Sequence, residues 1–230
     1  MVPSGQQSPL RFTIAAFDKR DRMMADVDPE EIELLRSGGS DQFAEVFSRY
    51  EDRLQRMIRF RLDRRLYGRV DSADVLQEVW LDASKRVAEY VANPVVPVFI
   101  WLRQIAWQTI IDLHRRHLGA QKRSVANEVA LGGGSSQEDT SLSIAARLAG
   151  DLTSPSQAAM RDERMQQLRQ ALAEMDEMDR EVLALRHFEE LGNNEVAEIL
   201  GIQKTAASNR YVRALKRLKE VLEQFPDLSG

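Results

Sequence analysis

The chain has 230 residues, of which 43% are apolar and 30% charged, and its formal net charge is −4 at pH 7. With 7% aromatic residues and 12 glycines, this composition favours helices over sheets, in one large or two small domains. The sequence contains no cysteine, which excludes disulfides and thiolate metal sites, and its three histidines make histidine-based metal chemistry a poor expectation.

Residues 1–26 are expected to form a loose N-terminal extension, for which a short amphipathic helix and an expression remnant both stay open. The apolar segment Leu10–Phe17 is interrupted by Arg11 and Thr13, unlike the hydrophobic region of a secretory signal. No span of the sequence approaches the roughly 18 apolar residues of a membrane helix. We therefore expect a soluble, cytoplasmic protein with no membrane insertion.

Residues 27–118 are predicted to form a first helical domain. A helix start is signalled at Asp28–Glu31, where aspartate can cap, proline suits the first turn and acids oppose the helix dipole; Gly38 and Gly39 end that helix. A longer helix is predicted over about Asp41–Leu66, with a basic far end whose plainest interpretation is a solvated helix end. Its apolar side comprises Phe43, Val46, Phe47, Tyr50, Leu54, Met57, Ile58 and Leu62, and its basic end Arg59, Arg61, Arg64 and Arg65.

Two further helices, about Ser72–Tyr90 and Val98–His117, are joined by a short connection that contains proline. Each has apolar residues at helical spacing. The second helix also carries cations, amides and an indole, which suit a nucleic-acid surface because cations meet phosphates and a flat ring can stack on an unpaired base. These polar and aromatic positions are Arg103, Gln104, Trp107, Gln108, Arg115 and Arg116.

Residues 119–156 are predicted to be a flexible linker, because periodicity fades and a glycine-serine run occupies 132–136; a short helix around Leu142–Leu148 stays open. Residues 157–230 are predicted to form a second helical domain. Its expected helices are Gln157–Met175, Asp179–Glu189, Asn193–Leu200 and Lys204–Gln224.

The last two of these helices, joined at Gly201, have the arrangement of a helix-turn-helix, with a plain helical hairpin as the alternative. We expect Asn193 or Asn194 to cap the first, and apolar residues including Val212 and Leu215 to hold the pair together. The early outward positions of the second helix suit base edges and the later cations suit phosphates. These positions are Lys204, Thr205, Ser208, Asn209 and Arg213 for bases, and Arg210, Lys216, Arg217 and Lys219 for phosphates.

Motifs in both domains resemble a known family. In the first domain they are Asp71, Asp74-Val75, Gln77-Glu78-Val79-Trp80, Trp101-Leu102, Ile105-Ala106, Asp112 and Arg115-Arg116. In the second they are Val196-Ala197, Leu200-Gly201, Ser208-Asn209-Arg210 and Arg213-Ala214. The first set resembles conserved region two of bacterial sigma factors and the second resembles region four. Two such domains joined by a linker are the layout of the extracytoplasmic-function (ECF) group within the sigma-70 family.

The resemblance implies an all-α protein with a region-two bundle and a region-four helix-turn-helix. It implies that this protein binds the beta-prime and beta subunits of core RNA polymerase and directs the polymerase to promoter DNA. It implies no enzymatic activity and no cofactor, and it adds an anti-sigma protein to the partners to be considered. The implied polymerase-binding residues are Asp74, Gln77, Glu78 and Leu81. Those implied to recognise and melt the minus-ten element are Asn93, Arg103, Trp107, Gln108, Arg115 and Arg116. Those implied to read the minus-thirty-five element are Lys204, Thr205, Ser208, Asn209, Arg210, Arg213, Lys216 and Arg217.

Three alternatives stay open. A conventional helix-turn-helix repressor or activator would explain the C-terminal third and leave Asp71–His117 without a role. An enzyme would need more than His114 and His117, which share a helix in a basic neighbourhood with no third ligand near. An adaptor that binds only proteins would not need the basic clusters. Ala207, Asn209, Trp107 and Gln108 depart from the commoner family pattern, so the resemblance does not imply the promoter sequence. No residue implies the inducing signal.

Overall fold

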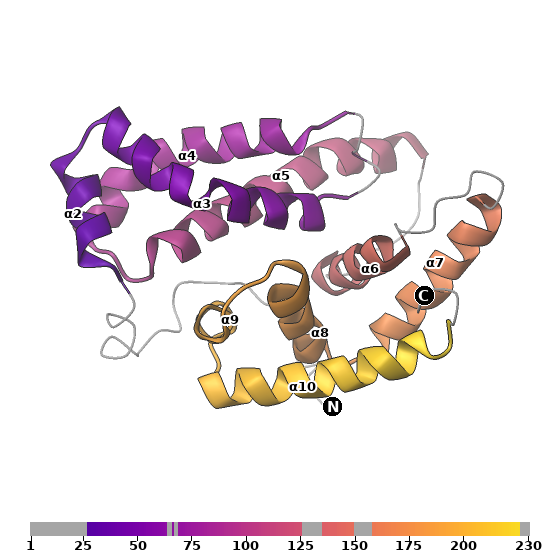
Figure 1. Ribbon diagram of the computed structural model, residues 1–230. Coiled ribbons are helices and arrows are strands. Elements are labelled where there is room, and N and C mark those ends of the chain that lie inside the picture. Colours follow the sequence, from indigo (N-terminus) through magenta and orange to yellow (C-terminus); the bar gives the residue numbers. More distant parts are fainter. Residues whose placement is uncertain (1–26, 64–65, 67–68, 126–134, 150–157, 226–230) are drawn as a thin grey trace, which may run out of the picture.

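The computed structural model describes residues 27–63, 66, 69–125, 135–149 and 158–225, and within these ranges all regular structure is helical (Figure 1). The predicted N-terminal extension lies outside the described residues. Helices α2 to α5 form an N-terminal domain, and α7 to α10 form a C-terminal domain beneath it, with α6 between the two (Figure 1). The predicted all-α architecture of two small helical domains is confirmed.

The N-terminal domain contains α2 (Pro29–Ser37), α3 (Ser40–Arg61), α4 (Ser72–Ala92) and α5 (Val98–Val125). Asp28 caps α2 as predicted, because its carboxylate accepts the backbone N–H of Glu30 at 2.9 Å. The core lies between α3, α4 and α5, where Leu54, Val75 and Leu102 are completely buried. Helix α3 ends at Arg61 instead of Leu66, and α5 continues eight residues past the predicted end at His117.

The C-terminal domain contains α7 (Ala158–Ala173), α8 (Glu177–Leu183), the π-helical turn η5 (Ala184–Phe188), α9 (Asn193–Leu200) and α10 (Lys204–Leu222). Helix α8 and η5 together occupy the predicted helix 179–189. Gly201 follows α9 with φ +63°, a left-handed conformation that glycine adopts without a Cβ clash, and this lets the chain turn sharply into α10.

Helix α6 (Ser135–Ala149) lies within the predicted linker and is longer than the helix that the sequence left open there. The side chains of Ile144 and Ala145 are fully buried. They belong to an apolar cluster that also contains Leu168 of α7 and Leu183 of α8. Helix α6 therefore packs as part of the C-terminal half of the molecule. The glycines of the 132–136 run lie outside the described residues.

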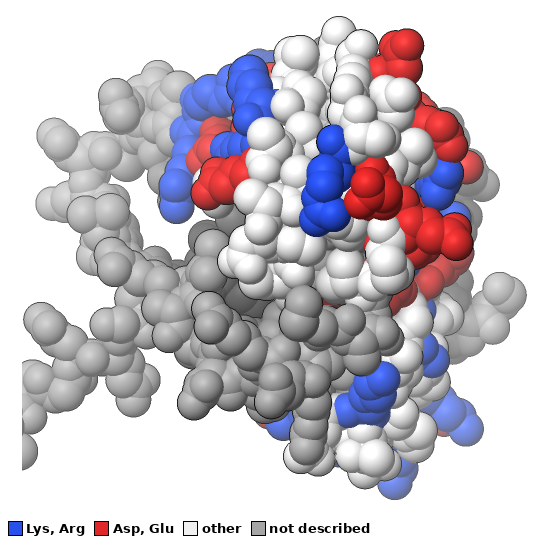
Figure 2. Space-filling model, turned by 90° about the vertical axis from the view of Figure 1, so that its left-hand side faces the viewer, with Lys and Arg blue, Asp and Glu red and all other residues white. Residues whose placement is uncertain are grey.

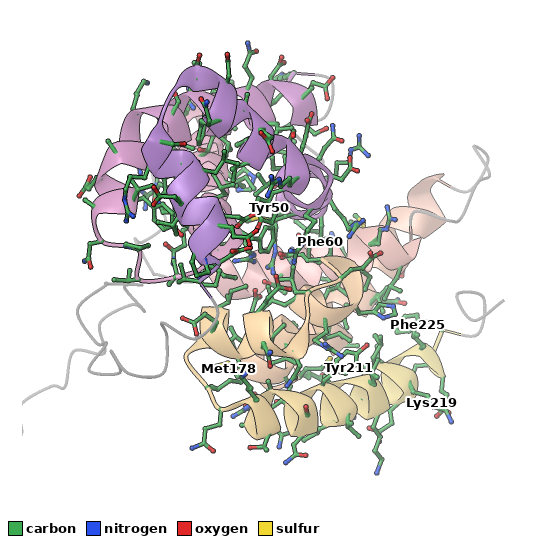
Figure 3. The ribbon with its side chains drawn as sticks, turned by 60° about the vertical axis from the view of Figure 1, so that its left-hand side comes forward. Tyr50, Phe60, Met178, Tyr211, Lys219 and Phe225 are labelled. Atoms are coloured by element: carbon green, nitrogen blue, oxygen red, sulfur yellow. The ribbon has the colours of Figure 1, made fainter. Side chains whose placement is uncertain are left out.

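The two domains share their apolar cores. Phe60 of α3 belongs to the α6–α7–α8 cluster, and its ring stacks on Phe188 of η5 with centroids 5.1 Å apart and planes 8° from parallel. In the other direction, Val182, Leu185 and Val196 belong to the cluster that fills the N-terminal domain. Figure 3 shows Phe60 at the boundary between the two halves. The domains are thus docked through an apolar contact as well as through charges.

Every helix in the described ranges is too short or too polar to cross a lipid bilayer.

Candidate nucleic-acid interface

The predicted polymerase-binding residues lie on one outer side of α4. Asp74, Gln77 and Leu81 are exposed, and steps of three and four residues keep them on one helix face. Glu78 is half-buried and accepts a hydrogen bond from Arg116 of α5 at 3.0 Å. The opposite side of α4 is buried in the domain core. The face is therefore polar with one large apolar side chain, Leu81, which is 50% exposed.

The connection between α4 and α5 is anchored from inside the domain. The Tyr90 hydroxyl donates to the carbonyl oxygen of Val96 at 2.7 Å, and the Tyr90 ring stacks on Trp101 with centroids 4.4 Å apart. Trp101 packs against the core. Asn93 follows the last residue of α4 and is exposed. The connection thus presents Asn93 to solvent on a fixed backbone.

Four of the six predicted minus-ten residues are exposed. They are Asn93, Gln108, Arg115 and Arg116. On α5, the Gln108 amide donates to Asp112 at 3.1 Å, and Arg115 lies 3.8 Å from the same carboxylate. These exposed contacts are weak, since water competes for the hydrogen bond and salt screens the ion pair, so both side chains can take other partners.

Arg103 and Trp107 differ from the prediction of an open DNA-contacting surface. Arg103 is only 7% exposed, and its guanidinium lies against Glu189 of the C-terminal domain, with Nη2 2.9 Å from Oε2. Trp107 is half-buried, and the guanidinium carbon of Arg61 lies 5.3 Å from its ring centroid. The sequence places both residues on the polar edge of α5. In the structure, Glu189 of the other domain covers Arg103, and Arg61 of α3 lies against Trp107.

Arg61 is the centre of a buried ion cluster. It was predicted to be part of a solvated helix end, and the structure buries it. Its Nε donates to Glu189 at 2.6 Å and its Nη2 to Glu181 at 2.6 Å. Its Nη1 donates to Thr140 of α6 at 3.1 Å, and the Thr140 hydroxyl donates to Glu181 at 2.9 Å.

The protonation states in this cluster follow from burial opposed by pairing. Burial lowers the pKa of Arg61, but the carboxylates of Glu181 and Glu189 outweigh it and the pKa is raised overall. Burial likewise raises the pKa of Glu181, and Arg61 outweighs it, so that this pKa is lowered. Arg61 and Glu181 are therefore charged at neutral pH.

The helix-turn-helix is formed by α9 and α10. Helix α9 begins at Asn193, but Gly192 is its cap residue in place of the predicted asparagine, and the Glu195 carboxylate accepts the Gly192 N–H at 2.8 Å. The Asn193 amide instead donates to the carbonyl oxygen of Lys204 at 2.8 Å, which joins the starts of the two helices. This bond fixes the position of the first turn of α10.

Helix α10 presents most of the predicted minus-thirty-five residues to solvent along the lower edge of the molecule (Figure 1). The exposed ones are Lys204, Thr205, Ser208, Asn209, Arg213 and Lys216, while Arg210 and Arg217 are half-buried. In the view of Figure 2, acidic and basic groups alternate over the upper part, and Lys and Arg predominate at the lower end, which α10 forms. This helix has the polar, cationic outer face that a DNA groove requires.

Asp179 of α8 holds two arginines of α10, a contact that the sequence analysis missed. Arg210 donates to Asp179 at 2.6 Å and to Asp176 at 2.9 Å, and Arg213 donates to both oxygens of Asp179. Burial raises the pKa of the Asp179 carboxyl, but the bonds from Arg213 and Arg210 outweigh it and lower the pKa overall. A buried carboxylate thus orients the two guanidiniums.

The inner side of α10 also differs from prediction. Val212 is 68% exposed and Leu215 36% exposed, so neither holds the helix pair together. The buried positions are instead Ala207, Ala214, Leu218 and Val221. Val212 and Leu215 therefore lie on a different side of α10 from the buried positions.

Two segments of the chain match protein families. Residues 46–118 match the family described as Sigma-70 region 2, and residues 165–218 match Sigma-70, region 4. Together the two segments cover more than half of the chain, in the order that the sequence motifs indicated.

Three relatives that match most of the chain are named as RNA polymerase sigma factors. The ECF RNA polymerase sigma factor SigW of Bacillus subtilis is 24% identical over 195 residues, which are 84% of this chain and 96% of the relative. RNA polymerase sigma factor YlaC of the same organism is 26% identical over 171 residues, 74% of this chain and 88% of the relative. The RNA polymerase sigma-H factor of Pseudomonas aeruginosa is 23% identical over 197 residues, 85% of this chain and 94% of the relative.

Among solved structures, that of CnrH in complex with the cytosolic domain of CnrY has a TM-score of 0.48 and 19% identity, and covers 86% of this chain and 99% of that one.

Proposed function

The chain belongs to the sigma-70 family of transcription initiation factors, in its ECF group, and we propose that it binds core RNA polymerase and directs it to specific promoters. In this proposal the N-terminal domain recognises and melts the minus-ten element, and the C-terminal domain reads the minus-thirty-five element. The chain contributes binding and positioning, and the polymerase contributes the chemistry. We place its action in the cytoplasm, with the polymerase.

The observation that carries the proposal is the presence of both family regions in one chain, each with the surface its role needs. Region two alone would supply a polymerase-binding domain without an upstream DNA reader. Region four alone would fit a conventional helix-turn-helix regulator. Their combination explains why a duplex-reading helix and a hairpin suited to single strands occur together.

For polymerase binding, we propose the outer face of α4. Asp74, Gln77 and Glu78 supply polar contacts and Leu81 supplies an apolar one, which matches a helical partner with its own mixed surface, here the beta-prime subunit. An exposed leucine within a polar patch is a feature that a protein interface buries. The beta subunit is the second expected contact.

For the melted minus-ten element, we propose Asn93, Gln108, Arg115 and Arg116, with Arg103 and Trp107 once they are uncovered. Asn93 has an amide that can pair with the edge of an unstacked base, and the arginines can follow the strand phosphates.

For the minus-thirty-five element, we propose that Lys204, Thr205, Ser208 and Asn209 face base edges from the first turns of α10. The cations that follow along the helix suit phosphates. They are Arg210, Arg213, Lys216, Arg217 and Lys219. Since Asp179 orients Arg210 and Arg213 from α8, those two guanidiniums are better suited to backbone positioning than to base reading.

The test mixes the purified chain with core polymerase and promoter DNA and follows strand opening at the minus-ten element. We expect DNA opening to require both the chain and the polymerase. A conventional repressor or activator would bind duplex DNA on its own and open none, and that result would replace the proposal with its alternative.

Polymerase binding has its own variant. Asp74→Ala combined with Gln77→Ala should weaken the affinity for core polymerase in a pull-down, with Glu33→Gln on the exposed surface of α2 as a control that should bind normally. Unchanged affinity of the double variant would exclude this face of α4 as the binding surface.

A further inference from the structure

Four arginines of the N-terminal domain point at one short acidic segment of the C-terminal domain. Arg53 lies 2.7 Å from Glu195, and Arg56 lies 2.8 Å from Glu190. Arg61 is paired with Glu181 and Glu189, and Arg103 with Glu189. We call the face of α3 and α5 formed by Arg53, Arg56, Arg61 and Arg103 the basic face, and Glu181, Glu189, Glu190 and Glu195 the acidic segment.

The acidic segment is fitted to the basic face. Glu189 is 1% exposed and is shared between Arg61 and Arg103, so one carboxylate serves two guanidiniums from two different helices. Glu190 has φ +58°, a left-handed conformation that is uncommon for a residue with a side chain, and its carboxylate reaches Arg56 from that position. The stack of Phe60 on Phe188 seals the same contact.

The acidic segment also occupies a surface that nucleic acid would need. Arg103, a predicted minus-ten residue, is covered by Glu189 of the acidic segment. Trp107, the other partly covered one, lies beside Arg61 of its own domain, and Arg61 is in turn paired with Glu189. A phosphate group presents oxygens to a guanidinium in much the same geometry as a carboxylate. A DNA strand is therefore a chemically suitable replacement for the acidic segment.

We propose that the basic face is a binding surface for a single DNA strand and that, in the free protein, the acidic segment of the same chain occupies it and holds the two domains closed. The role assigned to DNA rests on the function proposed above, whereas the closed state rests on the contacts alone. Opening frees Arg103 and also Arg61, whose guanidinium lies beside the ring of Trp107. The outer face of α10 lies on the other side of the C-terminal domain and stays exposed in both states (Figure 3).

Charge balance explains why the closed state can open reversibly. Arg61 and Arg103 are matched by Glu181 and Glu189, so the buried cluster is neutral as a whole. Buried pairs of this kind specify a geometry more than they add stability, because the desolvation of each charge offsets the attraction between them. Removing one carboxylate leaves an unmatched buried cation and should favour opening.

Glu189→Gln is the test of closure, and adding Arg103→Gln is its matched rescue, since the pair Arg61–Glu181 is then again neutral. Because the chain has no cysteine, nitroxides can be attached at Ala88→Cys on α4 and Glu223→Cys after α10, both exposed and away from the contact. Pulsed dipolar EPR on the free full-length protein should give a narrow distance distribution for the parent chain. Glu189→Gln should give a broad distribution at longer distances, and the double variant should return toward the narrow one.

A second pair guards against misfolding of the first variant. Glu190→Lys, at a largely exposed site, places a cation against Arg56 and should broaden the distribution, and Arg56→Glu should restore it. A broad distribution in the parent chain, a narrow one in both single variants, or no recovery in either double variant would overturn the closed state. None of these results involves polymerase or a promoter, so the proposed function would still stand.

DNA competition is measured with a short fluorescent oligo(dT). If the closed state is dominant, Glu189→Gln should bind it about tenfold more tightly or better, because apparent affinity scales with the fraction of competent molecules. Glu33→Gln on α2 removes the same charge away from the contact and is the control for net charge. Equal binding by Glu189→Gln and Glu33→Gln would overturn the assignment of the basic face to DNA.

Discussion

Phe60→Ala should loosen the contact between the two domains more than it loosens either domain. Phe60 belongs to α3, yet its ring is 9% exposed and lies in the cluster of Ile144, Leu168 and Leu183. Truncation of a buried phenylalanine to alanine costs about 3–5 kcal/mol when the surroundings cannot relax. Here the surroundings can relax, because the two domains can separate. The measured loss of stability therefore cannot exceed the free energy with which the domains dock.

Leu54→Ala is the matched comparison, since Leu54 is fully buried on the same helix but inside the N-terminal domain. It should cost about 2–5 kcal/mol of N-terminal domain stability. Backbone hydrogen exchange separates the two effects, because it reports each region on its own. Phe60→Ala should speed exchange in α6 and in Val182–Leu185 and leave Val75–Val79 of α4 protected, and Leu54→Ala should do the reverse.

The opposite outcome would refute the reasoning. If Phe60→Ala exposed the amides of α4 as much as Leu54→Ala does and left α8 protected, Phe60 would be a residue of the N-terminal core and the docked arrangement would not exist in solution.

Three further predictions concern the C-terminal domain. Arg180→Met should lower its stability by about 1.5–3 kcal/mol in urea unfolding, because the buried guanidinium donates to three backbone carbonyls at the end of α7, whereas the exposed Lys219→Met should change it little. Because the pKa of Asp179 is lowered in the folded state, its contribution to the free energy of unfolding is fully present above its unfolded pKa of about 3.9 and is lost as the pH falls through the folded pKa. The urea midpoint should therefore fall when the pH is lowered below about 4. Asp179→Asn should remove that part of the pH dependence of the midpoint. Lys204→Ala should weaken binding to minus-thirty-five duplex in a gel-shift assay and leave polymerase binding intact, and a loss of polymerase binding would contradict the separation of roles between the domains.

The sequence predicts the helices well where local signals are strong. Asp28 and Pro29 start α2, and Gly201 with its left-handed backbone separates α9 from α10, because caps and turns depend on neighbouring residues only. The predicted linker hides α6, since its serine-rich composition outweighs a few apolar positions such as Ile144. Those positions become informative only when α3 and α7 are brought beside them.

The inner side of α10 shows a second limit of the pattern. Hydrophobic periodicity gives most weight to the largest apolar side chains, and it therefore selects Val212 and Leu215. The structure buries Leu218 and Val221 further along the helix but uses Ala207 and Ala214 in its first half, where a small residue lets the neighbouring helix approach closely. The size of the gap is a property of the neighbouring helix, and no local signal reports it.

The candidate sites divide in the same way. Residues that face solvent on the helices, such as Gln108 and Ser208, lie where helical periodicity places them. Arg103 does not, because Glu189, the residue that buries it, is 86 positions away in the chain. Asp179 was missed for the same reason, since it acts only through arginines more than 30 residues distant. The spacing of residues along the sequence does not report ion pairs between distant segments.

Charge pairing between the domains also explains why the contact is not purely apolar. A dry interface between the two domains would gain free energy with every buried carbon and would close almost permanently. The cluster around Arg61 instead places charged groups in the interface, which water hydrates well and to which phosphate can bind. The ion pairs therefore fix the geometry of the closed state and add little to its stability. Phe60 and Phe188 then supply a limited apolar contribution that holds the arrangement together. Under the proposed function, in which the two domains separate on DNA, this balance makes closure specific and opening reversible.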